Sequence, residues 1–139
     1  MRRTVEDLLV AARARLGRVT PHQALAEQRA GALLVDTRTF EQRRDQGCVP
    51  GAVVIDRTVF EWRLDPASPW HIPQVGDHDA RVIVLCRQGY SSSLAAAGLQ
   101  DLGLHRATDV IGGFEAWRDA GLPIEPFDPE VPQTPAGAA

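Results

Sequence analysis

The sequence predicts one α/β domain of three layers, in which helices cover both faces of a mostly parallel β-sheet. Short apolar runs, such as residues 32–35 and 82–85, alternate with helical segments along the chain. This pattern is typical of strands that are buried on both faces of a parallel sheet. A chain of 139 residues with 44% hydrophobic content can also fill one sizeable core but not two.

Two helices are expected before the first strand. Thr4 and Asp7 form a capping pattern at the start of the first helix, which ends at Gly17. The second helix begins at Thr20, an N-cap that is followed by Pro21 at the first helical position. We expect the first helix to pack on the outside of the domain.

The next segment continues the alternation of strands and helices. The strand at residues 32–35 ends at Asp36, and a polar helix over residues 39–46 follows it. A turn at residues 49–51 then leads into a second short strand at residues 52–55.

The central part of the chain contains a long connection and the strongest strand. Three prolines and several polar side chains predict a surface loop over residues 64–80. Residues 82–85 form a fully apolar strand, and an Ala- and Leu-rich helix begins near Ser92 and stops at Gly103.

The last expected elements are a strand over residues 108–111 and a helix over residues 114–120. The Pro-, Ala- and Gly-rich end of the chain predicts disorder. The predicted organisation is therefore an N-terminal helical extension over residues 1–19, the α/β domain over residues 20–125 and a disordered tail over residues 126–139.

Composition and charge argue against several functions. The net charge is −3, and the basic residues, all arginines, alternate with acidic residues in stretches such as 41–45. Such stretches are typical of solvated helix faces, so we expect no nucleic-acid partner. Residues 1–20 lack the apolar core of a signal peptide, and no segment approaches the roughly 20 apolar residues that span a bilayer. A soluble cytoplasmic protein without a membrane partner is expected.

The cysteines and histidines offer neither a disulfide framework nor a metal site. Cys48 and Cys86 are the two cysteines of the chain, and the cytoplasm would keep them reduced. The histidines stand apart, and none has a second histidine three or four residues away. We therefore expect no metal and no cofactor.

Cys86 is the candidate nucleophile because of its place in the chain. It follows the strongest strand, and ligands bind beyond the carboxyl ends of strands in open parallel sheets. Gly89 permits a tight loop, and the helix behind it directs free N–H groups and its positive dipole end toward the thiol. Together with the charge of Arg87, this cradle should favour the thiolate, which is the reactive form. The alternative, from position alone, is an inert core cysteine.

The loop and three further motifs resemble the rhodanese-like sulfurtransferases, over roughly residues 20 to 125. Cys86-Arg87-Gln88-Gly89-Tyr90-Ser91 is similar to the family's six-residue active-site loop, whose cysteine carries a persulfide. The other similar segments, in the family's order, are Leu34-Val35-Asp36-Thr37-Arg38, Gly47-Cys48-Val49-Pro50-Gly51-Ala52, and Gly112-Gly113-Phe114-Glu115-Ala116-Trp117 with Gly121-Leu122-Pro123.

The resemblance implies an enzyme of rhodanese type with a rhodanese-like three-layer fold and no cofactor. Cys86 would accept a sulfane sulfur from a donor such as thiosulfate and pass it to a thiol, to cyanide or to a protein acceptor. The residues expected to bind the substrate are Arg87, Gln88, Gly89, Tyr90, Ser91 and Ser92. Asp36 and Arg38 would be structural.

Two departures from the family pattern change these expectations. Tyr90 and Ser91 stand where many family loops have a second basic residue, which leaves Arg87 as the only charge of the loop and predicts weaker binding of dianionic thiosulfate. Cys48 replaces a common histidine, and a packed turn residue is favoured over a resolving thiol. Arg57, Trp62 and Arg63 could form a substrate rim, although a solvated or packed role is favoured.

Two competing functions remain to be tested. A phosphatase or arsenate reductase would need an arginine six residues after the nucleophile, and this position is Ser92. A non-enzymatic interaction or redox-sensing module would use the same thiolate without loading sulfur on it.

Overall fold

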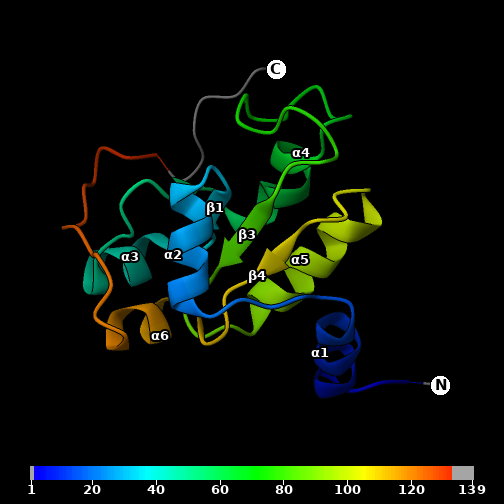
Figure 1. Cartoon of the computed structure of the whole chain (residues 1–139), viewed down its shortest axis with the longest axis horizontal. Coiled ribbons are helices and arrows are strands. Elements are labelled where there is room, and N and C mark those ends of the chain that lie inside the picture. The colour runs from blue at the N-terminus through cyan, green and yellow to red at the C-terminus, as the bar shows by residue number, and fades with distance from the viewer. Residues whose placement is uncertain (1, 133–139) are drawn as a thin grey trace.

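The computed structural model describes residues 2–132 and arranges them as helices on both sides of a parallel sheet (Figure 1). The elements alternate much as the sequence predicts. In chain order they are α1 (Val5–Ala14), α2 (Pro21–Arg29), β1 (Leu33–Asp36), α3 (Phe40–Gln46), β2 (Val53–Val54), η1 (Arg57–Val59), α4 (Phe60–Leu64), β3 (Val82–Leu85), α5 (Ser91–Asp101), β4 (Thr108–Asp109) and α6 (Gly113–Asp119).

The sheet has four strands in the order β2-β1-β3-β4, and all neighbouring strands are parallel. The two central strands pair along their whole length, from Leu33 opposite Val82 to Asp36 opposite Leu85. Their carboxyl ends therefore lie at one edge of the sheet, where the loops after Asp36 and Leu85 meet. The three-layer α/β/α prediction is confirmed.

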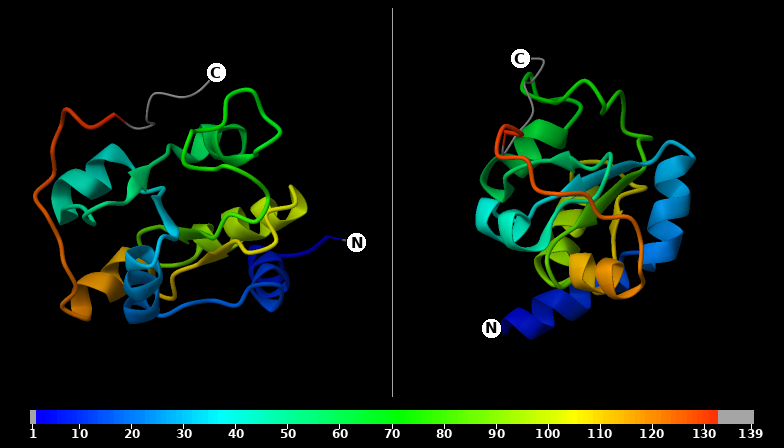
Figure 2. Two further views of the ribbon diagram at one scale, coloured as in Figure 1. Left: turned by 45° about the horizontal axis from the view of Figure 1, so that its top comes forward. Right: turned by 90° about the vertical axis from the view of Figure 1, so that its left-hand side faces the viewer.

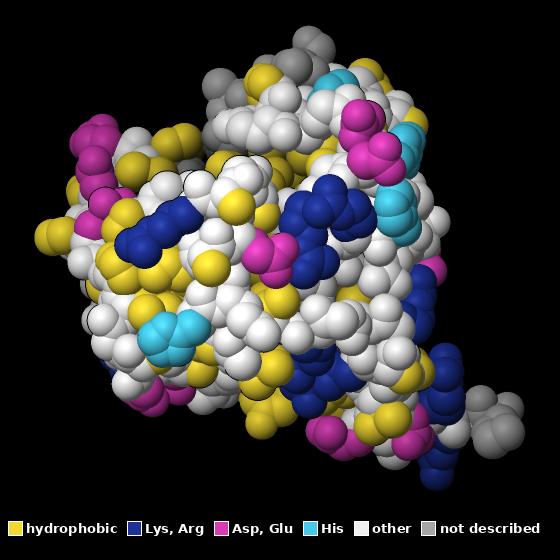
Figure 3. Space-filling model, in the orientation of Figure 1, with side chains coloured by type: hydrophobic (Ala, Val, Ile, Leu, Met, Phe, Trp, Pro, Cys, Tyr) yellow, Lys and Arg dark blue, Asp and Glu magenta, His cyan; other side chains and the backbone are white. Residues whose placement is uncertain are grey.

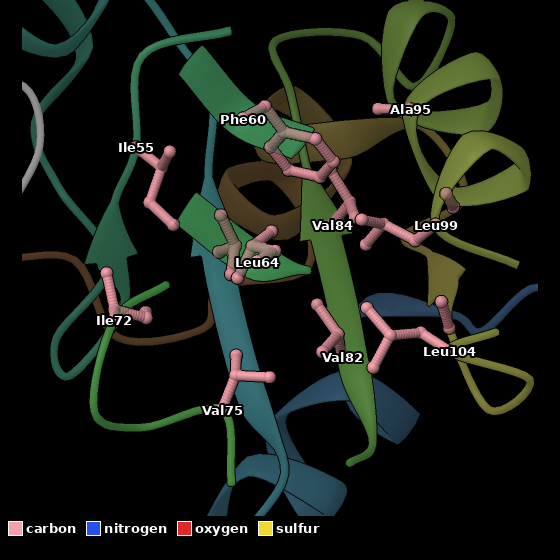
Figure 4. Close-up of a cluster of buried hydrophobic side chains, with 13 residues drawn as sticks. Ile55, Phe60, Leu64, Ile72, Val75, Val82, Val84, Ala95, Leu99 and Leu104 are labelled. Carbon is pink, nitrogen blue, oxygen red and sulfur yellow. The ribbon is translucent and has the colours of Figure 1, made fainter. Parts of the chain in front are cut away.

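One face of the sheet is covered by α4 and α5. Val82 and Val84 of β3 point to this side, where Phe60 and Leu64 of α4 pack with Leu99 of α5 (Figure 4). These five side chains are fully buried. Burial of such a side chain stabilises the fold by about 1.5–3 kcal/mol.

The opposite face is covered by α2 and α6, which lie side by side (Figure 2). Because side chains alternate along a strand, Ile83 and Leu85 of β3 point to this second face. There they pack with Ala24 of α2 and with Phe114 and Trp117 of α6. The helix that follows the Gly112-Gly113 motif thus belongs to the core.

The start signals of the first helices are confirmed. Thr4 and Thr20 are N-caps, and each forms a complete capping box with the residue three positions later. The first helix lies on the outside of the molecule, as predicted, where it packs against α5 (Figure 1). Leu9 and Ala12 form its buried face.

The expected surface loop over residues 64–80 is wrong in part. Ile72 and Val75 are fully buried in the core with Leu64, which ends an unpredicted helix, α4. Prolines and polar side chains surround these apolar residues in the sequence. The composition of the segment therefore did not indicate that two of its residues pack in the core. The strands β2 and β4 are also shorter than predicted.

The chain beyond residue 124 contacts the domain before the described residues end. Glu125 pairs with Cys48 through two backbone hydrogen bonds, and the Phe127 ring packs edge-on against Phe40, with 4.9 Å between centroids. Residues 133–139 of the expected tail lie outside the described residues.

The surface carries charges of both signs. On the face shown in Figure 3, basic side chains form several separate groups with acidic side chains among them. Within residues 2–132, no helix is long and apolar enough to cross a membrane.

Candidate active site

Cys86 lies at the carboxyl end of the central strand β3, as predicted. Its loop leads directly into α5, and the loop after β1 runs beside it, tied by the bond from the Thr37 N–H to the Leu85 carbonyl (2.9 Å). The Cys86 residue is 5% exposed, and the N–H of Gly89 donates to its Sγ at 3.1 Å.

The thiol borders a surface pocket of about 380 Å³. The loop contributes Arg87, Gln88, Tyr90 and Ser91, all of which were predicted to bind the substrate. The segments after β1 and β2 supply the rest of the lining, which is Thr37, Arg38, Thr39, Gln42 and Arg57. The carboxyl ends of three strands thus converge on one pocket.

Two carbonyl groups of the loop, those of Cys86 and Arg87, are turned toward α6 and away from this pocket. The first backbone amides of α6 hold both of them, because Phe114 N–H donates to Cys86 O (2.8 Å) and Glu115 N–H donates to Arg87 O (3.1 Å). In a planar trans peptide the carbonyl and the following N–H point in opposite directions. The bonds to α6 therefore turn the N–H groups of Arg87 and Gln88 to the other side.

These N–H groups are the ones that the predicted cradle requires. Within residues 2–132, the amides of Arg87, Gln88, Tyr90 and Ser91 have no hydrogen-bond acceptor, while that of Gly89 reaches the sulfur. A loop of unpaired amides at the start of a helix attracts an anion. This arrangement can stabilise negative charge on Cys86 or on an atom bound to it.

Glycines allow the loop to approach α6 so closely. Gly89 has φ +85°, and a Cβ there would lie 2.7 Å from the backbone nitrogen of Gly112. Gly113 has φ +61°, and its Cβ would lie 2.5 Å from the carbonyl oxygen of Cys86. The glycine motif at the start of α6 is thus required by the geometry of the Cys86 loop.

The electrostatic role expected of Arg87 needs correction. Its Nε donates to Glu115 Oε2 at 2.8 Å, so a carboxylate compensates its charge. Gln88 donates to the same carboxylate at 3.3 Å. The hydrogen bond from Arg87, followed by that from Gln88, holds the pKa of Glu115 below its usual range.

Ser92 does not line the pocket, contrary to the predicted substrate contact. It is fully buried, and its Oγ donates to Asp109 Oδ2 at 2.7 Å. Ser93 donates to the same oxygen at 2.8 Å, and Arg18 Nε donates to Oδ1 at 2.9 Å. Ser92 thus anchors α5 to β4 behind the loop.

Asp36 and Arg38 form the structural pair expected of them. Arg38 Nη2 donates to Asp36 Oδ2 at 2.8 Å and to the carbonyl of Gly47 at 2.9 Å, and its guanidinium stacks 3.8 Å from the Phe114 ring centroid. Both side chains are almost fully buried. The pair joins the loop after β1 to α3 and α6.

The three residues that could form a substrate rim, Arg57, Trp62 and Arg63, lie in different environments. Arg57 borders the pocket and pairs with Glu61 at 2.9 Å. Trp62 is exposed away from the pocket lining, and Arg63 is buried and donates to the Trp70 carbonyl at 2.7 Å. Arg87 is therefore not the only cation near the thiol, since Arg38 and Arg57 also line the pocket.

Cys48 lies in a different environment. It borders a separate cavity of about 110 Å³ with Asp36 and Glu125, and burial raises the pKa of its thiol. Both cysteines are free thiols. Because Cys48 is absent from the lining of the Cys86 pocket, the role of a packed turn residue is favoured over that of a resolving thiol.

The sequence did not reveal the roles of Asp109 and Glu115. Asp109 accepts hydrogen bonds from the first turn of α5, and Glu115 accepts them from the side chains of Arg87 and Gln88. A polar pair, Thr108-Asp109, in a short buried strand was the available signal for the first. The glycine motif contains the second, but its partner Arg87 is distant in sequence. Across the described part of the chain, no group of three or more His, Cys, Asp or Glu side chains could hold a metal ion.

Comparison with known proteins identifies the family. The model of the rhodanese-like domain matches residues 20–120. The chain is 37% identical over 101 residues to the thiosulfate sulfurtransferase GlpE of Pseudomonas entomophila, covering 73% of this chain and 84% of that protein. It is 35% identical over 111 residues to GlpE of Actinobacillus succinogenes, covering 77% of this chain and 88% of that one.

Solved structures agree on the fold. A Rhodopseudomonas palustris protein, described as of unknown function and a possible tyrosine phosphatase, aligns with a TM-score of 0.81 and 33% identity over 90% of this chain and 96% of its own. A Pseudomonas aeruginosa thiosulfate sulfurtransferase aligns with a TM-score of 0.66 and 24% identity over 89% of this chain and 23% of its own. The chain belongs to the family of rhodanese-like domain proteins.

Proposed function

We propose that this rhodanese-type sulfurtransferase carries the transferred sulfur as a persulfide on Cys86. The observation that supports this most directly is the set of unpaired loop amides around a nucleophile that borders an open pocket. The same amides can hold the thiolate before transfer and the anionic terminal sulfur of the persulfide after it. Thiosulfate is the donor proposed from the relatives' names.

The first half-reaction loads the enzyme. The Cys86 thiolate attacks the outer sulfur of thiosulfate, and a new S–S bond forms between Sγ and that sulfur. The S–S bond of thiosulfate breaks, and sulfite leaves with the bonding electron pair. The negative charge now resides on the terminal sulfur of Cys86, within reach of the loop amides.

The second half-reaction unloads the enzyme. A thiolate or cyanide attacks the terminal sulfur, the S–S bond to Cys86 breaks, and Cys86 leaves as a thiolate with the electron pair. The products are a persulfide of the acceptor thiol or thiocyanate. No group has to deliver a proton in either step, which fits a pocket whose lining, among the described residues, contains neither histidine nor carboxylate.

The acceptor and the compartment are further parts of the proposal. The pocket is open to the surface, so an acceptor cysteine on another protein could reach the sulfur as well as a small thiol could. The reaction requires Cys86 to stay reduced, which the cytoplasm provides. We therefore place the protein in the cytoplasm, with a small sulfur donor and a thiol acceptor.

The pocket does not favour phosphatase chemistry. The position that a clamping arginine would occupy is Ser92, whose hydroxyl is buried against Asp109. Position 92 therefore does not supply the arginine whose two donors would stabilise a transferring phosphoryl group.

Steady-state turnover tests the proposed function. Thiosulfate and cyanide should yield thiocyanate with the wild-type protein and none above background with Cys86→Ala. An aryl phosphate should remain unhydrolysed by both proteins. Turnover of the phosphate that is lost in Cys86→Ala, without thiocyanate formation, would refute the proposal, and failure with every sulfane donor would favour the redox or interaction module.

A further inference from the structure

The helix α1 lies outside the segment that matches the family, yet it reaches the Cys86 loop. The match begins at residue 20, whereas α1 ends at Ala14. This helix packs against α5, the helix that begins directly after the loop (Figure 1). Arg13, in the last turn of α1, therefore lies beside the loop and the first turn of α5.

Arg13 contacts the loop and the helix behind it with one side chain. Its Nη2 donates to the carbonyl of Gly89 at 2.7 Å, and its Nε donates to Ser93 Oγ at 3.1 Å. Its guanidinium carbon also lies 5.5 Å from the centroid of the Tyr90 ring. A planar guanidinium can make these contacts at once, whereas an ammonium group cannot reproduce the fork.

The contact with Gly89 matters because of the peptide that it orients. The Gly89 N–H donates to Cys86 Sγ, and the Gly89 carbonyl accepts from Arg13. The N–H of Tyr90 belongs to the same peptide as that carbonyl and points away from the arginine. Glycine has the widest choice of backbone conformations, so the direction of these amides depends on what holds the carbonyl.

Arg13 also differs from the other arginines near the loop in its charge balance. Arg18 donates to the Gly89 carbonyl at 3.1 Å, but it pairs with the buried carboxylate of Asp109. Arg87 pairs with Glu115. Within residues 2–132, Arg13 has no carboxylate within 4.0 Å. Arg13 therefore has no direct ion pair where it meets the loop.

We propose that Arg13 is a positioning residue for the Cys86 loop. Through Arg13, the N-terminal helix α1 contributes to the geometry of the site. Arg13 holds the Gly89 carbonyl outward and thereby keeps the amides on both sides of Gly89 directed at the anion. The effect on sulfur transfer rests on the proposed function, whereas the effect on the loop can be measured without it.

The test compares Arg13→Gln with Arg15→Gln, both in a Cys48→Ala background, so that alkylation reports on Cys86 alone. Arg15 is the matched control because it also joins α1 to α5, through Asp101 at 2.5 Å, but within residues 2–132 it makes no hydrogen bond or ion pair with the loop. The first readout is the ratio of the Cys86 alkylation rates by iodoacetate, an anion, and iodoacetamide, a neutral reagent. The second is the rate of sulfur loading from thiosulfate.

Arg13→Gln should lower both the alkylation ratio and the loading rate roughly fivefold to tenfold, the effect of one lost charged hydrogen bond. Arg15→Gln should leave both within about twofold, since exposed ion pairs contribute little. Arg13→Lys keeps the charge and one donor, so it should recover part of each loss. It also provides the test if Arg13→Gln does not fold.

The outcomes separate this inference from the proposed function. Equal ratios and equal loading rates in the Arg13 and Arg15 variants would overturn the positioning role, even if the wild-type protein transfers sulfur. A wild-type protein that loads no sulfur, but whose alkylation ratio falls in Arg13→Gln alone, would overturn the proposed function and support the positioning role.

Discussion

The two cysteines of this chain both lie outside the helices and sheet strands, but their surroundings are opposite. At Cys86 the neighbouring amides are unpaired and the sulfur receives the N–H of Gly89. At Cys48 the backbone N–H and carbonyl both pair with Glu125, and burial raises the pKa of the thiol. One cysteine is therefore surrounded by free donors, and the other by a closed backbone bridge.

On the proposed function, the main chain around each thiol, more than the thiol itself, decides which of the two cysteines reacts. The loop amides at Cys86 are unpaired because other groups hold the carbonyls of the loop. The amides of Phe114 and Glu115 do so from α6, and Arg13 does so from α1. Any change that frees these carbonyls should make Cys86 resemble Cys48.

The largest effect on sulfur transfer should come from removing the two thiol groups one at a time. Cys86→Ala should abolish sulfur transfer, and Cys48→Ala should leave the transfer rate within about twofold, because Cys48 lies outside the pocket lining. Thiocyanate formation measures both. A Cys48→Ala variant as inactive as Cys86→Ala would show that the comparison is wrong.

A large effect is also expected where α6 meets the loop. At Gly113, alanine combines a left-handed backbone with a Cβ 2.5 Å from the Cys86 carbonyl, so Gly113→Ala should destabilise the fold by at least ~1–2 kcal/mol and slow transfer. Gly98→Ala is the control, because nothing lies within 4 Å of its Cβ. Urea unfolding and transfer rates of both variants give the comparison, and equal behaviour would contradict the close approach.

A smaller effect should follow from removing the Glu115 carboxylate. Glu115→Gln removes the carboxylate that holds the side chains of Arg87 and Gln88, so the loop should be less well ordered and transfer slower. The loss should be only roughly twofold to fivefold because the pair is solvent-exposed. Since the pKa of Glu115 is lowered in the folded protein, its contribution to stability is present above the usual glutamate pKa. It is lost as the pH falls through the lower folded value.

Urea unfolding of the wild type and Glu115→Gln at a series of pH values measures this contribution. The difference in the free energy of unfolding should persist at neutral pH and close in acid. A difference that grows in acid would contradict the assigned direction of the pKa.

The smallest effect concerns Cys48 itself. Because burial raises the pKa of its thiol, alkylation of Cys48 at neutral pH should be slower than that of an exposed peptide cysteine and should rise only in alkaline solution. Iodoacetamide labelling of Cys86→Ala against pH measures it. Fast labelling at neutral pH would show that the turn around Cys48 is open.

The strands and capped helices were predictable because their signals are local. The apolar run at residues 82–85 and the caps Thr4 and Thr20 each depend on a few neighbouring residues. The buried anchors Ile72 and Val75 were not predictable, since a mostly polar segment hid two residues that only the distant sheet selects.

The candidate site divides in the same way. Cys86 and the residues that follow it are contiguous, so one motif identified them. Arg13 and Asp109 come from elements distant in sequence, and Ser92 was misplaced because motif position does not reveal that a side chain faces the core.

Intact mass spectrometry after incubation with thiosulfate tests the central claim most directly. The wild type and Cys48→Ala should each gain the mass of one sulfur atom, lose it again on addition of cyanide, and Cys86→Ala should gain nothing. A sulfur adduct that forms in Cys86→Ala, or the absence of any adduct in Cys48→Ala, would contradict the assignment of the persulfide to Cys86.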